Sequence, residues 1–395
     1  MGKWVKKKLG DLGFSFSGLS GKTIDDFGEG KPFIPYMNIF TNGKINSKQL
    51  EYVRIAENER QNKVEQGDWF FTTSSETPDA VGMTSVLVED IGEAYLNSFC
   101  FGFRLYDKSE FEPEFVSYLF RSLELRKKIS LFAQGSTRYN LPKQQMFNKL
   151  YISYPSSLSE QRRIASILSS ADKVIDSTQK LIAKYKSIKQ GMMEDWLKPK
   201  EGWKKVKLGE CCEINPKTDT SKVLDDDIIV FVKMEDVSND GFITSFNEKT
   251  YQSLQKKGFT VFQNDDVIFA KITPCMENGK GALVRGFDTK ICMGSTEFHV
   301  IRACENISID FIYQLTISKQ FRLKAEMQMT GSAGQQRVPI SFLEDYLFYI
   351  PDFSEQCRIA SILSSIDKKI ESEKKVLEKY KKIKKGLMEK LLNGE

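Results

Sequence analysis

Histidine is nearly absent from this sequence, because His299 is the single one among 395 residues. Metal sites built from several histidines and Ser-His-Asp catalysis both need this side chain, so the sequence nearly excludes both. The seven cysteines are odd in number and include no C-x-x-C pair, which predicts reduced structural thiols. His299 lies in the alternating run "STEFHVIR", where we expect a packed side chain rather than a ligand.

Long apolar runs are absent as well. No stretch approaches the roughly 20 residues that a membrane-spanning helix needs, and the initial "MGKWVKKKLGDLGF" lacks the apolar segment of a signal peptide. We therefore expect a cytoplasmic protein with no membrane partner. The net charge of +5 is too small to indicate a nucleic-acid partner by itself, so that inference depends on where polar and basic residues lie.

The common motifs of catalysis are missing too. There is no G-x-x-x-x-G-K-[ST] phosphate loop, no H-E-x-x-H and no G-x-G-x-x-G after a strand. The stretch "NPKT" from Asn215 lacks the second proline and the aromatic residue of amino-methyltransferase motifs. We therefore predict no catalytic, cofactor-binding or metal-binding residues in this chain. An enzyme with an unrecognised site is a weaker alternative, which activity of the purified chain alone would support.

A repeated dodecamer is the strongest positive signal. "SEQRRIASILSS" begins at Ser159 and "SEQCRIASILSS" at Ser354, so eleven of twelve positions agree across a shift of 195 residues. The match continues outward, and the shift reaches 199 between Trp4 and Trp203. A slow drift of this kind indicates a duplicated unit with a few short insertions. We divide the chain into a first variable domain (1–158), a first conserved helix (159–198), a second variable domain (199–353) and a second conserved helix (354–395).

Both conserved segments carry apolar residues at alternating steps of four and three. Such a heptad pattern, kept for nearly five heptads, predicts a coiled coil. Polar residues interrupt both copies in one register, at Thr178 and Lys189 and at Glu373 and Lys384. Each helix of roughly 38 residues would be about 57 Å long. The predicted seam consists of Ile164, Leu168, Ala171, Ile175, Ile182, Tyr185, Met192, Ile359, Leu363, Ile366, Ile370, Leu377, Tyr380 and Leu387.

The connection between the two helices favours an antiparallel pair. A globular domain fills the chain between the end of one helix and the start of the other, and it returns the chain only a limited distance. A parallel pair would crowd both domains at one end, whereas an antiparallel pair is expected to place them at opposite ends, related by a pseudo-twofold axis. Two independent surface helices, each packed on its own domain, are the alternative.

The variable domains mix strand-like runs, such as "SVLVED", "YLNSFCFGFRL", "DIIVFV" and "DDVIFAKI", with the helical stretches "EFVSYLFRSLELRKKISLF" and "DFIYQLTISKQFRLKAEM". This order predicts two similar α/β domains and an α+β fold class. Polar loops with glycine follow at matched places, from Thr72 and Ala270 and again from Ala133 and Met329. Their side chains are of the types that hydrogen-bond base edges and phosphates, although each loop could also be a solvated turn. The candidate DNA-binding residues are Thr72, Thr73, Ser74, Ser75, Thr137, Arg138, Tyr139, Asn140, Lys143, Lys271, Thr273, Lys280, Gln335, Gln336 and Arg337.

The order of variable domain, conserved helix, variable domain and conserved helix, with "SEQxRIASILSSxDKxI" after a Tyr-Pro or Ile-Pro step, resembles the specificity subunit of type I restriction-modification systems. The resemblance covers the whole chain. It implies two target-recognition domains, each reading one half of an interrupted, asymmetric DNA sequence, held by an antiparallel coiled coil. No base-contacting residue can be transferred individually, because these domains differ from one target to another.

The resemblance also implies partners, namely double-stranded DNA, two methyltransferase subunits that use S-adenosylmethionine to methylate adenine N6, and restriction subunits that use ATP. These cofactors, with magnesium, would belong to the partners, and none would belong to this chain. The rival function is an adaptor that does not bind DNA and presents two protein-binding modules on a coiled coil. Failure to bind duplex DNA at low salt, even with the methyltransferase present, would favour the adaptor.

Overall fold

The computed structural model describes residues 3–255, 257–332 and 334–394. The chain divides into two compact units, one made of Met1–Gln179 with Val376–Glu395 and the other of Lys180–Lys375. Each unit contains one variable domain and parts of both long helices. The boundaries between the units therefore cross the helices, and they differ in this respect from the linear division expected from the repeat.

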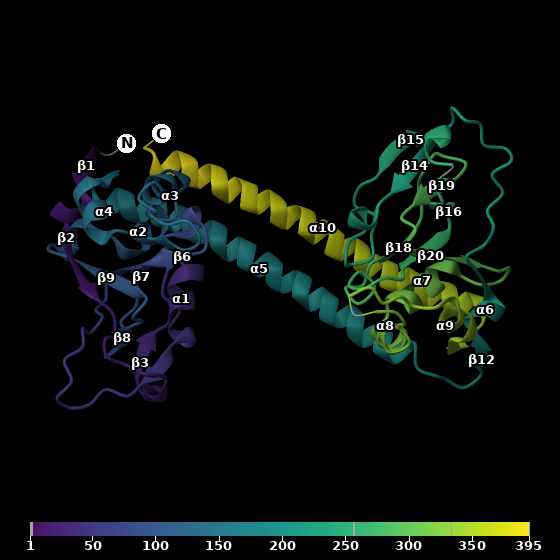
Figure 1. The fold of residues 1–395 in the computed structure, drawn as a ribbon, viewed down its shortest axis with the longest axis horizontal. Coiled ribbons are helices and arrows are strands. Elements are labelled where there is room, and N and C mark those ends of the chain that lie inside the picture. The colour runs from purple at the N-terminus through teal and green to yellow at the C-terminus, as the bar shows by residue number, and fades with distance from the viewer. Residues whose placement is uncertain (1–2, 256, 333, 395) are drawn as a thin grey trace. The chain divides into compact units, whose positions relative to one another are not determined.

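The first unit begins with a variable domain of short strands and helices (Figure 1). Its strands are β1 (Trp4–Lys8), β2 (Gly13–Ser17), β3 (Phe27–Ile34), β4 (Glu51–Val53), β5 (Trp69–Thr72), β6 (Ser74–Ser75), β7 (Thr84–Val86), β8 (Tyr95–Leu96), β9 (Cys100–Leu105), β10 (Tyr139–Asn140) and β11 (Tyr151–Pro155). Its helices are α1 (Tyr36–Thr41), α2 (Pro113–Leu119), α3 (Leu123–Ser130) and α4 (Lys143–Lys149), followed by the start of the long helix α5 (Leu158–Trp196). The main sheet has the order β2-β9-β5-β7, and the smaller sheets are β4-β3-β8, β1-β11 and β6-β10.

Aromatic side chains fill the core of this first domain. In the antiparallel pair of β5 and β9, Trp69 lies opposite Phe103 and Phe71 opposite Phe101, and all four side chains are fully buried. The rings of Phe71 and Phe101 are stacked with their centroids 5.1 Å apart. Burying a side chain of this size stabilises a fold by about 1.5–3 kcal/mol. The same core includes buried residues of α2, α3 and the first turns of α5, so it joins the sheet to the long helix.

The second unit repeats this architecture. Its strands are β12 (Lys204–Lys207), β13 (Cys212–Ile214), β14 (Ile228–Val232), β15 (Asn247–Thr250), β16 (Thr260–Phe262), β17 (Asp266–Ala270), β18 (Gly281–Leu283), β19 (Cys292–Gly294), β20 (Phe298–Ala303) and β21 (Leu347–Ile350). Its helices are α6 (Leu208–Cys211), α7 (Ile309–Ile317), α8 (Lys319–Met327) and α9 (Ile340–Asp345), followed by the start of the long helix α10 (Phe353–Leu392). The sheets have the orders β13-β20-β17-β18, β15-β14-β19-β16 and β12-β21.

The register of the main sheet is the same in both domains. β17 pairs with β20 so that Val267 lies opposite Ile301. A shift of 198 residues relates this pair to Trp69 and Phe103, which lie opposite each other in β5 and β9. The duplication inferred from the sequence is therefore present in the pairing of the strands.

Each helical stretch predicted near the end of a variable domain is in fact two helices. Ser122 separates α2 from α3, and Ser318 separates α7 from α8. The Ser122 hydroxyl accepts a hydrogen bond from the Leu125 amide, and the Ser318 hydroxyl accepts one from the Phe321 amide. Serine at an N-cap starts a new helix in this way, although the apolar pattern runs on without a break. The run "YLNSFCFGFRL" is likewise two strands, β8 and β9, with a turn at 97–99 between them.

Within the second unit, α5 and α10 run in opposite directions. The Lys369 ammonium group lies over the Tyr185 ring at 5.9 Å, and the Lys189 ammonium group lies 2.6 Å from the Asp367 carboxylate. Residue numbers therefore rise along α5 as they fall along α10. The antiparallel orientation predicted from the connectivity is confirmed.

The last turns of α10 complete the first unit. Leu392 is buried in the same core as Ile164 of α5, and Leu387, Met388 and Leu391 pack against this core. Figure 1 shows this end of α10 beside the elements of the first domain. The second helix thus contributes to the core of the domain that it does not follow in the chain.

The predicted seam residues lie mainly on the faces of α5 and α10 that are turned from solvent. Those that are buried are Ile164, Leu168, Ile182, Ile359, Leu363, Ile370 and Leu377, and those that are half-buried are Ala171, Ile175, Tyr185, Met192, Ile366 and Leu387. Tyr380 is 36% exposed, so its place in the seam was wrongly predicted, and Met193 is buried more fully than Met192. An α-helix has 3.6 residues per turn and drifts from a 3.5-residue repeat by about 20° per heptad, which explains both departures.

Candidate nucleic-acid interface

The first domain brings its two predicted loops together. β6 pairs antiparallel with β10, so that Ser75 lies opposite Tyr139 and Ser74 opposite Asn140. The Leu141 amide also donates a hydrogen bond to a carbonyl of the first loop at 2.8 Å. We call residues 73–77 and 137–140 the first loop pair.

The second domain joins the corresponding loops in the same way. The Thr273 amide donates to the Gln336 carbonyl at 3.0 Å, and the Val338 amide donates to the Lys271 carbonyl at 2.9 Å. His299 contributes to this arrangement, because Nε2 of its buried ring lies 2.9 Å from the Val338 carbonyl oxygen. Burial lowers the pKa of His299, as expected for a packed, neutral imidazole. We call residues 271–274 and 335–338 the second loop pair.

Several of the predicted DNA-binding residues form hydrogen bonds within the fold. Thr72 is fully buried at the end of β5, and its hydroxyl accepts a hydrogen bond from the Met83 amide, so the prediction that it contacts DNA is wrong. Ser74 is buried and bonded to Arg138, and Lys280 donates to a backbone carbonyl at 2.7 Å. The others are half-buried or exposed, namely Thr73, Ser75, Thr137, Arg138, Tyr139, Asn140, Lys143, Lys271, Thr273, Gln335, Gln336 and Arg337.

An apolar cleft of about 700 Å³ lies beside the first loop pair. Tyr36, Met37 and Phe40 of α1 form part of its lining, and Phe99 contributes from the turn before β9. Met37 and Phe99 are each 57% exposed. Large apolar side chains gathered at the surface mark a binding site more often than single ones do. This cleft was not predicted from the sequence, because Phe99 was assigned to a continuous strand.

Arg138 is the cationic group of this cleft. Its guanidinium donates to the Ser74 hydroxyl at 3.0 and 3.2 Å. It forms no ion pair within residues 3–255, 257–332 and 334–394. A guanidinium that has no carboxylate within ion-pair distance has its remaining N–H donors available for a ligand.

The equivalent place in the second domain has different chemistry. A shift of 198 residues carries Phe99 onto Glu297, and this carboxylate accepts two hydrogen bonds from Arg337 at 2.8 and 2.9 Å. The Arg337 guanidinium lowers the pKa of Glu297 below its usual value. The arginine of the second loop pair is therefore neutralised by an acid that the first domain replaces with an aromatic ring.

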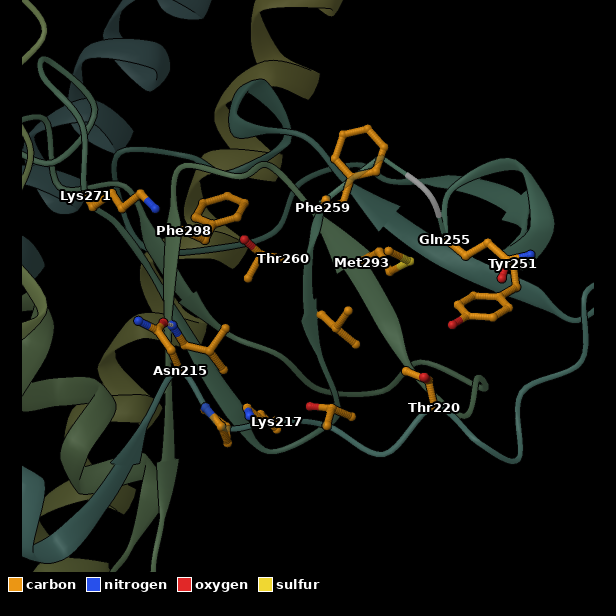
Figure 2. Close-up of a pocket in the computed structure, with 15 residues that line it drawn as sticks. Asn215, Lys217, Thr220, Tyr251, Gln255, Phe259, Thr260, Lys271, Met293 and Phe298 are labelled. Carbon is orange, nitrogen blue, oxygen red and sulfur yellow. Dashed lines mark hydrogen bonds between the residues drawn. The ribbon is translucent and has the colours of Figure 1, made fainter.

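A further groove, of about 510 Å³, lies in the second domain (Figure 2). Lys271 of the second loop pair contributes to its lining, together with Asn215 and Lys217 from the segment after β13. Tyr251 and Gln255 lie on the other side of the view. Ammonium, amide and aromatic groups together suit a strand of nucleic acid, because they contact phosphates, base edges and base faces.

Two arginines, the half-buried Arg126 and the buried Arg322, hold the loops that lead into the loop pairs. Arg126 of α3 donates to three carbonyls of the 79–82 turn at 2.6–2.7 Å. Arg322 of α8, at a shift of 196 residues, donates to two carbonyls within 276–280 at 3.1 Å. Burial lowers the pKa of Arg126 to about 10 and that of Arg322 to about 9. Because burying a guanidinium is costly, these bonds to the backbone are what keep both groups in place.

The repeated dodecamer attaches each domain to its long helix. Gln161 is fully buried, and it accepts a hydrogen bond from one backbone amide and donates to two backbone carbonyls of the first domain. Gln356 is also buried, and it accepts from one amide and donates to one carbonyl of the second domain. These contacts explain why the glutamine occurs in both copies.

In the first unit, one carboxylate joins the domain to both helices. Asp172 of α5 accepts a hydrogen bond from the Tyr118 hydroxyl of α2 at 2.8 Å, and it pairs with Lys384 of α10 at 2.5 Å. The carboxylate raises the pKa of Tyr118, in addition to the larger effect of burial. The orientation of the first domain on the helix pair is therefore fixed by a hydrogen bond and an ion pair at one point.

The second unit has the same arrangement with the helices exchanged. Asp367 of α10 accepts a hydrogen bond from the Gln314 side chain of α7 at 3.1 Å, and it pairs with Lys189 of α5 at 2.6 Å. The polar interruptions of the heptads, noted at Lys189 and Lys384, are thus the partners of two equivalent aspartates. Asp240, from the loop before β15, adds ion pairs to Lys186 and Lys374 in this unit.

Comparison with known proteins identifies the class to which this arrangement belongs. The family described as "Type I restriction modification DNA specificity domain" matches residues 1–186 and again 200–382, so the chain belongs to that family. Its relatives include the type I restriction enzyme EcoEI and EcoAI specificity subunits of Escherichia coli, at 37% identity over 42% of the chain and 42% identity over 40%. These matches span only 28% and 27% of the two E. coli proteins.

Longer matches at lower identity agree with this assignment. The MjaVIII specificity subunit of Methanocaldococcus jannaschii is 26% identical over 70% of this chain and 69% of its own. The fold is similar to that of the S subunit from M. genitalium, with a TM-score of 0.55, 14% identity and coverage of 99% and 96% of the two chains. A chain from a structure on assembly and conformational transition of the type I restriction-modification system has a TM-score of 0.60, 15% identity and coverage of 98% and 97%.

The described residues also bear on other kinds of site. No helix among them is long and apolar enough to cross a lipid bilayer. In the same part of the chain, no group of three or more His, Cys, Asp or Glu residues is arranged to hold a metal ion.

Proposed function

We propose that this chain selects the DNA target of a type I restriction-modification complex and reads a bipartite, asymmetric sequence through its two variable domains. One observation supports this most strongly. The contacts that attach each domain to the helices recur in both units, whereas the loop pairs differ. Glu297 replaces Phe99 and binds Arg337, which occupies the position of Asn140 in the first domain. Arg138 forms no ion pair in the described part of the chain. An asymmetric, two-part target requires two recognition domains whose DNA-contacting residues differ, and here both domains are attached to the helices in the same way.

Two copies of a methyltransferase subunit would bind the starts of the long helices. Arg163 and Ser166 of α5 recur as Arg358 and Ser361 of α10, and all four side chains are exposed. Packing does not constrain exposed side chains, so their identity in both copies favours a common partner at both places. Restriction subunits would join through the same complex.

The chemistry would belong to these partners. S-adenosylmethionine would be bound by the methyltransferase subunits, and ATP and magnesium would act with the partner subunits, while this chain supplies the choice of target and no catalytic group. An adaptor that presents two protein-binding modules without contacting DNA is the rival function.

The test is to delete the gene and to map adenine N6 methylation across the genome. We expect a single bipartite motif to lose its mark, and expression of the chain to restore it. The reconstituted complex with methyltransferase subunits should bind a duplex with that motif, with an affinity that falls steeply as salt rises. An unchanged methylation map, together with no duplex binding at low salt, would favour the adaptor.

The partner surface has its own test. Arg163→Glu combined with Arg358→Glu should weaken assembly with the methyltransferase subunit by at least tenfold, while Lys127→Glu, an exposed change on α3, should not. Each substituted arginine forms an exposed ion pair with a glutamate three residues before it, so the loss in stability should be below about 1 kcal/mol. Equal assembly of all three proteins would exclude this surface.

A further inference from the structure

We infer that the apolar cleft beside the first loop pair is a base-reading site, in which Arg138 recognises a guanine and the apolar wall contacts the methyl group of a neighbouring thymine. This assignment rests on the proposed function and names the base and the residue that reads it. Four features of the first domain support it, namely the free donors of Arg138, the fixed position of its guanidinium, the apolar wall and the contrast with the second domain.

Arg138 has the donors that guanine requires. A guanidinium carries five N–H groups, and the bonds from Nε and one terminal nitrogen to Ser74 leave the other terminal nitrogen unused within the described part of the chain. The outer edge of the guanidinium therefore points two N–H groups away from Ser74. Paired donors of this kind match the O6 and N7 acceptors that guanine presents in the major groove.

The guanidinium is also held in position before any ligand binds. Ser74, which accepts both hydrogen bonds from the guanidinium, is buried. It lies in β6, and β6 pairs with β10, which begins directly after Arg138. The Tyr36 hydroxyl donates to the Ser74 carbonyl at 2.8 Å, which ties α1 to the same strand. An arginine fixed by such support loses less conformational entropy on binding than one on a free loop.

The lining of the cleft favours a base over a phosphate. Met37 and Phe99 expose more than half of their surface there, and neither can hydrogen-bond a phosphate oxygen. Glu76 contributes a carboxylate to the same lining, which repels phosphate. Apolar side chains do contact the thymine methyl group, so the wall suits a base step in which thymine lies next to the guanine.

The second domain provides the internal contrast. Arg337 lies in the second loop pair, where its Nε and Nη2 donate to Glu297 and its Nη1 donates to the Gln335 carbonyl at 3.2 Å. All three of its nitrogens therefore have a partner and Glu297 balances its charge, so a guanine would have to displace an existing bond. We therefore assign the arginine-to-guanine contact to the first domain alone.

The decisive experiment uses the full chain assembled with methyltransferase subunits. Arg138→Ala should lower affinity for the native target by roughly 5-fold to 150-fold and abolish the preference for guanine at one position of one half-site. Arg138→Lys should retain most binding to unrelated duplex and still lose the guanine preference, because a lysine lacks the planar pair of donors. Lys127→Ala, an exposed change on α3, is the control, and it should leave that half-site unchanged.

Modified DNA tests the contact atom by atom. Replacing the guanine with 7-deazaguanine, which lacks the N7 acceptor, should weaken binding of the wild-type complex and have no further effect on Arg138→Ala. Replacing the adjacent thymine with deoxyuridine should weaken the wild type and have no further effect on Phe99→Ala.

Two outcomes would overturn this assignment. A uniform loss of affinity for all sequences in Arg138→Ala would indicate a phosphate contact, and unchanged binding would exclude Arg138 from the interface. Failure of the wild-type complex to prefer any duplex sequence is a different result, because it would contradict the proposed function itself.

Discussion

The two loop pairs differ in charge although the domains that carry them are built alike. The first places the unpaired Arg138 beside an apolar wall, and the second joins Arg337 to Glu297. Arg126 and Arg322, in contrast, both hold loop carbonyls. Gln161 and Gln356 both hold the start of a long helix. Between these two sets of residues, the exposed side chains of the loop pairs have diverged since the duplication and the supporting contacts are retained.

The largest difference between the two units should appear when their equivalent lysines are removed. Lys189 and Asp367 have 12% and 9% of their side chains exposed, whereas Lys384 and Asp172 have 26% and 41% exposed. Removing one partner of a buried ion pair costs about 3–5 kcal/mol, and an exposed pair contributes about 0–1 kcal/mol. Lys189→Ala should therefore shift the denaturant midpoint of the full chain well beyond Lys384→Ala. Equal shifts would show that the two pairs are energetically equivalent.

The buried glutamines should give the next largest effect. Gln161→Ala leaves three backbone groups without a partner and Gln356→Ala leaves two. Since each unsatisfied buried group costs about 1–3 kcal/mol, in part relieved by water, we expect losses of about 3 and about 2 kcal/mol. Thermal unfolding of the two variants measures the difference. A larger loss for Gln356→Ala would contradict the ranking.

Substitution of Arg126 or of Arg322 should affect recognition of one half-site each. Arg126→Lys removes the planar set of donors that holds the 79–82 turn, and Arg322→Lys does the same for 276–280. Each should cost about 1–2 kcal/mol and should relax target choice in one half-site only, a different one for each variant. Methylation of a library with randomised half-sites reads this out. Relaxation of both half-sites by either variant would show that these arginines act on the whole fold.

The smallest change in stability, within about 0.5 kcal/mol, should come from adding a carboxylate beside the first loop pair or removing one beside the second. Phe99→Glu would add a carboxylate to the cleft that Arg138 lines. Glu297→Gln would remove the carboxylate that binds Arg337 in the second domain. The first change should weaken the guanine preference of its half-site, and the second should alter the other half-site. Binding to duplexes with single base changes tests both, and an unaltered preference would show that the carboxylate is irrelevant to reading.

The sequence alone was sufficient for the duplication, the two long helices and their antiparallel direction, because heptad spacing and internal identity are local signals. The loops that the sequence singled out lie side by side in each domain, and their contact with DNA stays a prediction. The sequence could not separate Thr72, which is buried, from Thr73, which is accessible, because burial of a short strand depends on which strands pack on both of its faces. Ser122 starts a new helix within an apolar pattern that looks continuous, and Phe99 lies in a turn between two strands. Neither break changes the apolar pattern, so the pattern alone could not show it.

Main-chain hydrogen bonds join β6 to β10 and Thr273 to Gln336, in addition to the side-chain bonds between Arg138 and Ser74. Substitutions at the outward-facing positions can therefore accumulate without separating the loops. A change at one exposed position can therefore alter the surface that a loop pair presents and leave the strands that hold it unchanged.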